Sequence, residues 1–141
     1  MTTESIHTEY ITESFKHTGS TVADNKRLSV YIAGPMANIE HYNFPAFNQA
    51  EKKLESSKIF RKIINPAKLD QNDRALDSTI ELTDEERKTI IIRDLKLLVE
   101  CDSIFMLEGW EDSKGAQVEH ALARYLNLKI FYQSRAGSVW S

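Results

Sequence analysis

Four short apolar runs, separated by stretches of helical periodicity, restrict this chain to one class of fold. The runs cover residues 28–33, 59–64, 103–107 and 128–132, and their β-branched and aromatic side chains predict strands. Apolar residues recur at helical spacing over residues 44–54, 83–100 and 115–126. Strands and helices that alternate in this way form a parallel sheet with right-handed crossovers and helices on both faces. The prediction is therefore an α/β fold, a flavodoxin-like or Rossmann-like three-layer sandwich with about four to five strands.

Local signals mark where these elements begin and end. Gly34-Pro35 and Asn65-Pro66 close the first two strands, and Thr83 to Glu86 has the capping-box pattern of a helix start. Residues 103–107 show no polar alternation, which is typical of a strand buried on both faces. The segment 65–82 is longer than an ordinary loop, so we expect a lid or a short helix there.

Length and composition limit the functions and partners that this chain can have. The 141 residues suit one domain, which we expect over residues 27–141, behind a polar, flexible tail at 1–26. A net charge of -3 gives no electrostatic footprint for DNA or RNA. Because no apolar run is long enough to span a bilayer and no signal peptide is recognisable, we expect no membrane partner and a cytoplasmic location. The single cysteine, Cys101, excludes an intrachain disulfide and is expected in the core.

Two loops are the expected ligand site. In parallel sheets of this kind, ligands bind beyond the carboxyl ends of the strands, commonly between the first and third strands. The corresponding loops cover residues 34–38 and 108–115. Ser113, Lys114 and Gly115 stand immediately before a helix, whose N-terminal N–H groups favour an anion such as phosphate. The alternative is that Ser113 is only a helix cap and Lys114 a solvated charge.

Glu119 is the first candidate for chemistry. It lies one turn into the last helix, and Ala116 and Ala123 share its face and leave space beside the carboxylate. Tyr31, in the first strand, is placed to reach a carboxylate at the end of the sheet; the alternative is a core aromatic with a satisfied hydroxyl. His120 adjoins Glu119 but points about 100° away on a helix, so it is not expected to be a catalytic partner.

Asp94 is the second candidate. The spacing 90, 94, 97 and 101 puts it on the apolar stripe of its helix, where an unpaired carboxylate would be costly to bury. One interpretation is that Asp94 caps or pairs with a nearby backbone group or with Arg93 and only holds the fold. The other is that two inward carboxylates flank one pocket, where one attacks an anomeric carbon and the other moves a proton.

Other residue types indicate less. Phe44, Phe47 and Trp110 are able to stack on a base, although Phe47 lies on the helix stripe and is expected in the core. The chain has no G-x-G-x-x-G or Walker pattern and no Cys/His cluster with metal-ligand spacing. We therefore expect neither a cofactor nor a metal.

The motifs together resemble the nucleoside 2-deoxyribosyltransferase-like superfamily, in particular a small phage-associated branch of uncertain function. The resemblance covers about residues 28–133 and is carried by Tyr31-Ile32-Ala33-Gly34-Pro35-Met36, Ile64-Asn65-Pro66-Ala67, Arg93-Asp94-Leu95 and Gly109-Trp110 through Glu119. It implies a glycosyl-enzyme ester on Glu119, a Tyr31 that orients this carboxylate, and an Asp94 that aids proton transfer or binds substrate. It also implies a homodimer or higher homo-oligomer, in the host cytoplasm if the protein is phage-encoded. The expected substrate-binding residues are Gly34, Pro35, Met36, Asn43, Phe44, Gly109, Trp110, Ser113, Lys114 and Gly115.

Ser113 bears on the substrate. In this superfamily the transferases of free nucleosides carry an aspartate six residues before the nucleophile, whereas the 5'-monophosphate N-hydrolases carry a serine. A hydroxyl beside a helix N-terminus can donate to phosphate, and a carboxylate would repel it. The hydrolases also carry an arginine in the loop after the first strand, where this chain has Ala37. Lys114, Lys68 and Arg74 are the candidates to replace it.

The resulting expectation is hydrolysis of the N-glycosidic bond of a (deoxy)nucleoside 5'-monophosphate through an intermediate on Glu119. Two alternatives remain open at this point. One is a nucleoside or nucleotide 2-deoxyribosyltransferase, which holds the intermediate until a second base arrives. The other is a non-catalytic protein that binds or sequesters a nucleotide.

Overall fold

The computed structural model describes residues 27–36, 40–73 and 82–134. Its four strands are β1 (Leu28–Ala33), β2 (Phe60–Ile64), β3 (Ser103–Met106) and β4 (Lys129–Tyr132). They form one all-parallel sheet in the order β2-β1-β3-β4. The predicted α/β class and parallel sheet are confirmed. The predicted tail at residues 1–26 lies outside the described residues.

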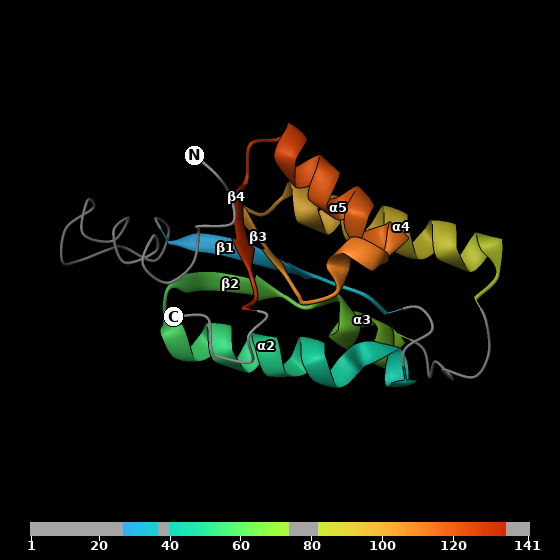
Figure 1. Cartoon of the computed structure of the whole chain (residues 1–141), viewed down its shortest axis with the longest axis horizontal. Helices are drawn as coiled ribbons and strands as arrows, with labels where there is room; N and C mark the ends of the chain where they lie inside the picture. Colours follow the sequence, from blue (N-terminus) through green and yellow to red (C-terminus); the bar gives the residue numbers. More distant parts are fainter. Residues whose placement is uncertain (1–26, 37–39, 74–81, 135–141) are drawn as a thin grey trace.

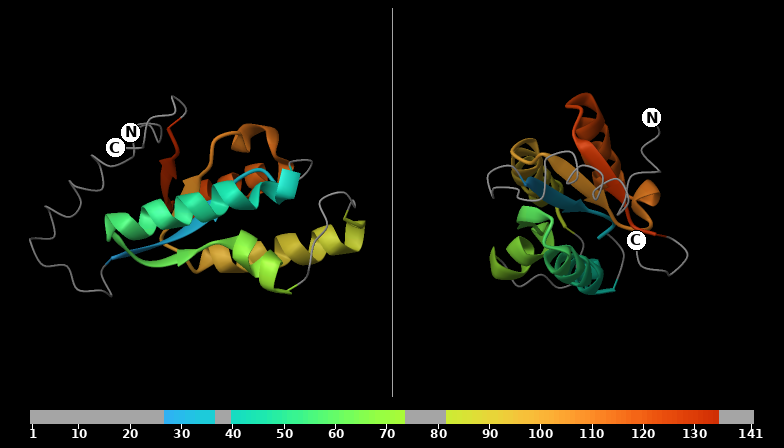
Figure 2. Two further views of the ribbon diagram at one scale, coloured as in Figure 1. Left: turned by 90° about the horizontal axis from the view of Figure 1, so that it is seen from below. Right: turned by 90° about the vertical axis from the view of Figure 1, so that its left-hand side faces the viewer.

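Helices cover both faces of the sheet (Figures 1 and 2). One face carries α2 (Phe44–Ser57) and α3 (Pro66–Asp73), and the other carries α4 (Asp84–Val99) and α5 (Lys114–Tyr125). Two short 3-10 helices, η3 (Glu40–Asn43) and η4 (Trp110–Asp112), precede α2 and α5. These layers are the predicted three-layer sandwich.

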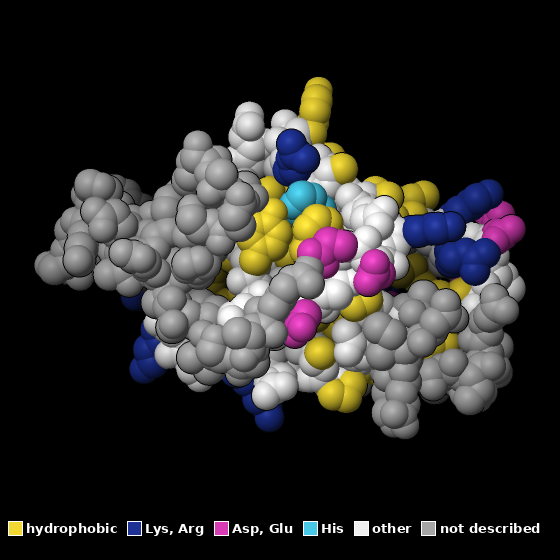
Figure 3. Space-filling model, in the orientation of Figure 1, with side chains coloured by type: hydrophobic (Ala, Val, Ile, Leu, Met, Phe, Trp, Pro, Cys, Tyr) yellow, Lys and Arg dark blue, Asp and Glu magenta, His cyan; other side chains and the backbone are white. Residues whose placement is uncertain are grey.

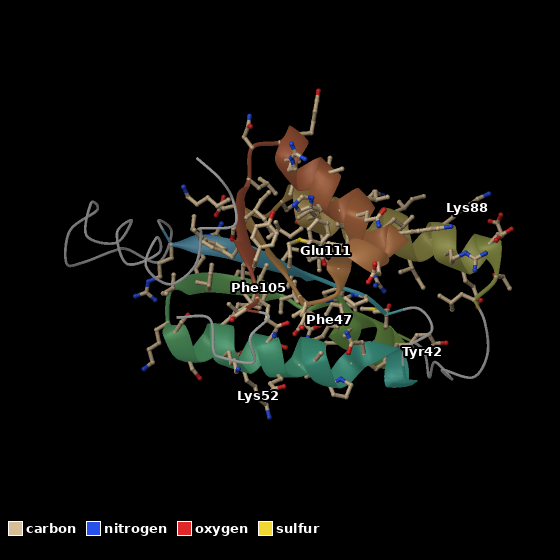
Figure 4. The ribbon with its side chains drawn as sticks, in the orientation of Figure 1. Tyr42, Phe47, Lys52, Lys88, Phe105 and Glu111 are labelled. Carbon is tan, nitrogen blue, oxygen red and sulfur yellow. The ribbon has the colours of Figure 1, made fainter. Side chains whose placement is uncertain are left out.

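Side chains of β1 alternate between two cores. Val30 and Ile32 belong to the cluster under α2, which also contains Phe47 and Phe105 (Figure 4). Tyr31 and Ala33 belong to the cluster under α4 and α5. Because successive side chains of a strand point to opposite faces, Tyr31 is directed toward the layer that carries Asp94 and Glu119.

Local chemistry accounts for the helix starts. The capping box of α4 is present, because the Thr83 hydroxyl accepts from the Glu86 N–H at 3.1 Å and the Glu86 carboxylate accepts from the Thr83 N–H at 2.8 Å. Helix α3, one of the two possibilities for residues 65–82, begins at Pro66, directly after Asn65. The Asn65 amide oxygen accepts from the Ala67 N–H at 3.0 Å, and Pro66 occupies a first-turn position that needs no N–H donor.

The first and third strands are held together tightly where they leave the sheet. The Leu107 N–H donates to the Ala33 carbonyl at 2.8 Å. A Cβ atom added to Gly34 would lie 2.7 Å from the Cβ of Leu107, whose side chain is buried. Glycine is therefore required at position 34 by close approach, not by backbone conformation.

This close approach predicts that Gly34→Ala lowers the free energy of unfolding by about 1–3 kcal/mol, because Leu107 has no space into which to move. Denaturant unfolding of the two proteins measures the difference. The matched control is Gly115→Ala in the first turn of α5, where an added Cβ meets nothing within 4 Å. That variant should be neutral or slightly more stable. Equal stability of the Gly34→Ala variant and the parent would contradict the packing argument.

Candidate functional site

The loops after β1 and β3 lie against each other at the carboxyl edge of the sheet. Strands β1 and β3 are neighbours, and the chain order changes direction between them, as predicted. A Cβ built on Gly109, which has a φ of 90°, would lie 3.5 Å from the Cγ of Pro35. The described parts of the two predicted ligand loops therefore lie side by side and form the candidate site. Ala37 and Asn38 lie outside the described residues.

Tyr31 and Glu119 meet at this site. The Tyr31 hydroxyl donates a hydrogen bond to Oε2 of Glu119 over 2.5 Å. Tyr31 is fully buried and Glu119 is 5% exposed, with the small side chains Ala116 and Ala123 also buried on α5. The contact between phenol and carboxylate that the sequence predicted is present. Its role in a reaction stays a prediction.

Asp94 is directed inward from α4, as its position on the apolar stripe indicated, and is 6% exposed. Its Oδ1 accepts from Nε and Nη2 of Arg93 at 2.9 and 2.7 Å. The pairing with Arg93 considered as a purely structural interpretation is therefore present. Asp94 also interacts electrostatically with Tyr31 and with Glu119, so the ion pair belongs to the same group of side chains.

Because they are buried, the carboxyl groups of Glu119 and Asp94 keep their protons to a higher pH than they would in water. Desolvation is the main cause that raises the pKa of Glu119 from 4.5 to about 8; the Tyr31 hydrogen bond opposes the shift and the charge of Asp94 adds to it. Desolvation also raises the pKa of Asp94 from 3.8 to about 6, against the hydrogen bonds and charge of Arg93. Burial and the two carboxylates raise the pKa of the Tyr31 phenol, which therefore remains a hydrogen-bond donor. In the free protein, Glu119 holds its proton more tightly than Asp94.

Ser113 caps α5 without using its own proton. Its hydroxyl oxygen accepts from the Ala116 N–H at 3.2 Å. A hydroxyl that accepts one hydrogen bond still has an O–H to donate, so the cap does not prevent contact with an anion. Lys114 and Gly115 are exposed in the first turn, and no atom lies within 4 Å of the position of a Cβ on Gly115. The two interpretations of this segment are thus compatible.

The other predicted binding residues are placed in different ways. Asn43 donates from Nδ2 to the Pro35 carbonyl at 2.9 Å and so fixes the loop after β1. Phe44 is buried in the core cluster under α2, and Met36 packs against that cluster while partly exposed. Phe47 is in the same core, as expected. Of these residues, Met36 and Asn43 retain some exposed surface, whereas Phe44 and Phe47 are buried.

Trp110 and His120 form an aromatic group at the side of the site. Their rings lie 4.2 Å apart between centroids, and His120 Nε2 is 2.9 Å from the Tyr132 hydroxyl. Burial lowers the pKa of His120, so its ring is neutral at neutral pH. The expectation that His120 does not serve Glu119 agrees with these contacts, which direct it toward the loop after β3 and the end of β4.

Of the basic residues proposed to replace the missing arginine, Lys68 is engaged elsewhere. Its Nζ lies 3.0 Å from Oε1 of Glu51, which also accepts from the Asn65 amide. Arg74 lies outside the described residues. Lys114 therefore remains the described candidate beside the start of α5.

One site residue was missed from the sequence. Asp70 on α3 is 2% exposed, and its Oδ1 lies 2.8 Å from Nη2 of Arg93. Its signal was weak, because it stands among other polar residues on a short helix with no regular apolar stripe. Within the described ranges, no group of three or more His, Cys, Asp or Glu residues could hold a metal ion, and no helix is long and apolar enough to cross a membrane.

The raised pKa of Glu119 predicts a stability change that requires no substrate. A carboxyl with a higher pKa in the folded than in the unfolded protein stabilises the fold fully below the unfolded pKa, here about 4.5, and loses this contribution as pH rises through about 8. Glu119→Gln has no charge to bury. We expect its Tm to exceed that of the parent by on the order of 5 °C at pH 9, with little difference at pH 4.5.

Thermal unfolding at the two pH values measures this effect, and Glu108→Gln is the control. Glu108 is an exposed carboxylate in the loop after β3, so its substitution should leave Tm unchanged at both pH values. A Glu119→Gln variant that is less stable than the parent at pH 9 would show that the ionised form is well accommodated.

Comparison with known proteins places the chain in a family. No curated protein and no solved structure matches it. A sequence model of one protein family matches residues 28–132, which span β1 to β4 and include Tyr31, Asp94 and Glu119. Since the match covers most of the chain, this protein belongs to the family described as a domain of unknown function (DUF4406).

Proposed function

We propose that this protein hydrolyses the N-glycosidic bond of a (deoxy)nucleoside 5'-monophosphate through a covalent intermediate on Glu119. The observation that carries the proposal is the hydrogen bond of 2.5 Å from the Tyr31 phenol to the buried Glu119 carboxylate. A second carboxyl, Asp94, interacts with the same phenol. Two neighbouring carboxyls suit a reaction that needs a nucleophile and a proton donor, although in the free protein Glu119 holds its proton to a higher pH than Asp94.

In the first step, an ionised Glu119 oxygen attacks the anomeric carbon while the bond from this carbon to the base nitrogen breaks. The base leaves with the bonding electron pair and receives a proton, for which Asp94 is the candidate donor. Water then attacks the anomeric carbon, its proton goes to Asp94, and the sugar phosphate leaves with Glu119 ionised again. Tyr31 holds the attacking carboxylate in one orientation during both steps.

The start of α5 is the proposed phosphate site. Ser113 has a hydroxyl proton to donate. The N–H groups of the first turn and the positive end of the helix dipole both favour a bound anion. The neighbouring loop carries exposed carboxylates at Glu108, Glu111 and Asp112, and acidic side chains gather near the middle of the face in Figure 3. Glu111, labelled in Figure 4, lies in η4, which comes immediately before α5. Because these charges repel an anion, a comparison of nucleotide with nucleoside is part of the test.

Base transfer is the second candidate, and the burial of Glu119 is the observation that favours it. A carboxylate that is 5% exposed forms an ester to which water has little access. An intermediate with a long lifetime allows a second base to enter and accept the sugar. The chemistry of the first step is the same for both candidates.

Incubation with a panel of ribo- and deoxyribonucleoside 5'-monophosphates, modified pyrimidines and the matching nucleosides should release free base, measured by chromatography. We expect faster release from the 5'-monophosphates than from the nucleosides. Repeating the reaction with an added free base separates the candidates, since a new nucleotide appears only if the sugar is transferred.

Glu119→Gln should lose at least a thousandfold in rate, because an amide does not form the ester. Tyr31→Phe should retain the fold and lose less. The matched control is Glu51→Gln, a carboxylate of α2 that contacts Asn65 and Lys68 outside the group around Glu119. Intact nucleotide after long incubation, bound equally well by the parent and by Glu119→Gln, would replace the proposal with a binding function.

The pH dependence of kcat/KM distinguishes the two roles of Asp94. If Asp94 donates the proton, the active form carries one proton for the pair, so the rate rises through about pH 6 and falls through about pH 8. If Asp94 only binds substrate, the rate rises through about pH 8 and stays high. The substrate phosphate also ionises near pH 6, so the falling limb decides. Asp94→Asn should abolish that limb in the first case.

A further inference from the structure

Helix α3 brings a third carboxylate to the site from the opposite layer. Asp70 lies on α3, whose residue Ala67 is part of the core under α2, whereas Arg93 and Asp94 lie on α4 across the sheet. The ion pair of 2.8 Å between Asp70 and Arg93 therefore joins the two helical layers. At 2% exposure, Asp70 is more deeply buried than either Asp94 or Glu119.

One guanidinium serves both aspartates. Nη2 of Arg93 lies 2.8 Å from Oδ1 of Asp70 and 2.7 Å from Oδ1 of Asp94, and Nε adds a further contact of 2.9 Å to Asp94. Arginine has five N–H donors in a rigid plane, so two carboxylates on that plane fix its orientation. Asp94 lies one residue along the same helix, whereas Asp70 contacts this 26% exposed side chain from the opposite layer.

We infer that Asp70 is a positioning residue for Asp94: it holds the Arg93 guanidinium against Oδ1 of Asp94 and offsets part of its positive charge, so that Asp94 can keep a proton. The titratable groups that face Asp94 are Arg93 on its own helix, Asp70 on α3, Tyr31 on β1 and Glu119 on α5. Only Arg93 among them is a cation. With Asp70 present, the guanidinium is shared between two carboxylates.

The charge balance agrees with this role. Burial is the largest influence on Asp94 and raises its pKa to about 6; Arg93 lowers it, and the charge of Asp70 raises it. An aspartate beside an arginine that it does not share has a pKa depressed by roughly 1–3 units. Without Asp70, the pKa of Asp94 would therefore be lower. The catalytic consequence rests on the proposed function, in which Asp94 gives a proton to the leaving base.

The test is a titration of Asp94 followed by carboxyl ¹³C NMR in protein labelled at aspartate. In Asp70→Asn we expect the pKa of Asp94 to fall by about one unit or more, because a like charge has been removed and the guanidinium of Arg93 has lost a competing carboxylate. The matched control is Glu51→Gln, which removes a buried carboxylate that contacts Lys68 instead of Arg93 and should leave the titration of Asp94 unchanged. An unchanged or raised pKa of Asp94 in Asp70→Asn overturns the inference.

The parent protein provides a second measurement in case Asp70→Asn does not fold. Asp70 must carry its negative charge throughout the pH range in which Asp94 titrates, since a neutral Asp70 would neither hold nor offset the guanidinium. Its carboxyl carbon should therefore show the ionised chemical shift between pH 5 and 7. A protonated Asp70 in that range overturns the inference as well.

Activity distinguishes this inference from the proposed function. If nucleotide cleavage is detected, Asp70→Asn should reduce kcat/KM about tenfold for each unit by which the pKa of Asp94 falls, because the protonated donor becomes rarer. Asp70→Glu, which keeps the charge, should recover most of the rate. If no nucleotide is cleaved but the titration shifts as expected, the proposed function fails and the role of Asp70 stands. If nucleotide is cleaved and the titration of Asp94 is unchanged in Asp70→Asn, the proposed function stands and the inferred role of Asp70 is overturned.

Discussion

The pairing of β1 with β3 at the centre of the sheet is the contact on which the rest of the site depends. It places Tyr31 opposite Ile104 and brings the loops after the two strands together. Alternation along β1 directs the Tyr31 phenol toward α4 and α5, where Asp94 and Glu119 lie. A slip of one residue in this register would move the phenol to the α2 face and leave both carboxyls without it.

A consequence of this arrangement is that the buried ionisable groups of the site lower the stability of the fold. Two buried carboxyls, Asp94 and Glu119, interact with the buried Tyr31, and a third, Asp70, pairs with Arg93, the cation that the structure places beside them. Such a group is more stable when it keeps at least one proton, and the carboxyl with the higher pKa is Glu119, the residue that must ionise to attack. Proteins commonly carry strain or electrostatic cost of this type at functional sites, where a substrate can relieve it.

The sequence predicted the sheet because each strand is a local pattern. Residues 28–33 and 103–106 are apolar runs bounded by punctuation, and Thr83 to Glu86 is a complete capping motif, so nearest-neighbour chemistry decides these elements. The contact of Tyr31 with Glu119 was predictable for a further reason. A parallel sheet with known strand order gathers its carboxyl ends at one edge, which relates residues that are 88 positions apart.

Asp70 could not be found in the same way. Helix α3 is eight residues long, and its burial comes from tertiary contacts of Ala67 and Asp70 instead of a repeated stripe. The contact of Arg93 with α3 is likewise not predictable from the sequence, because the neighbouring Asp94 already provides a partner for the guanidinium. Phe44 shows the converse, since its aromatic ring suggested stacking on a ligand and the packing of α2 buries it.

At position 113, the capping of α5 and the charge at its N-terminus can change independently. Its oxygen caps the helix through the Ala116 N–H, a task that serine and aspartate perform about equally well. An exchange between these two residues would retain the cap while adding or removing a negative charge where a ligand would approach the helix dipole. The preference for a charged or neutral ligand can therefore drift in evolution through single substitutions at this position, without a period in which the protein folds poorly.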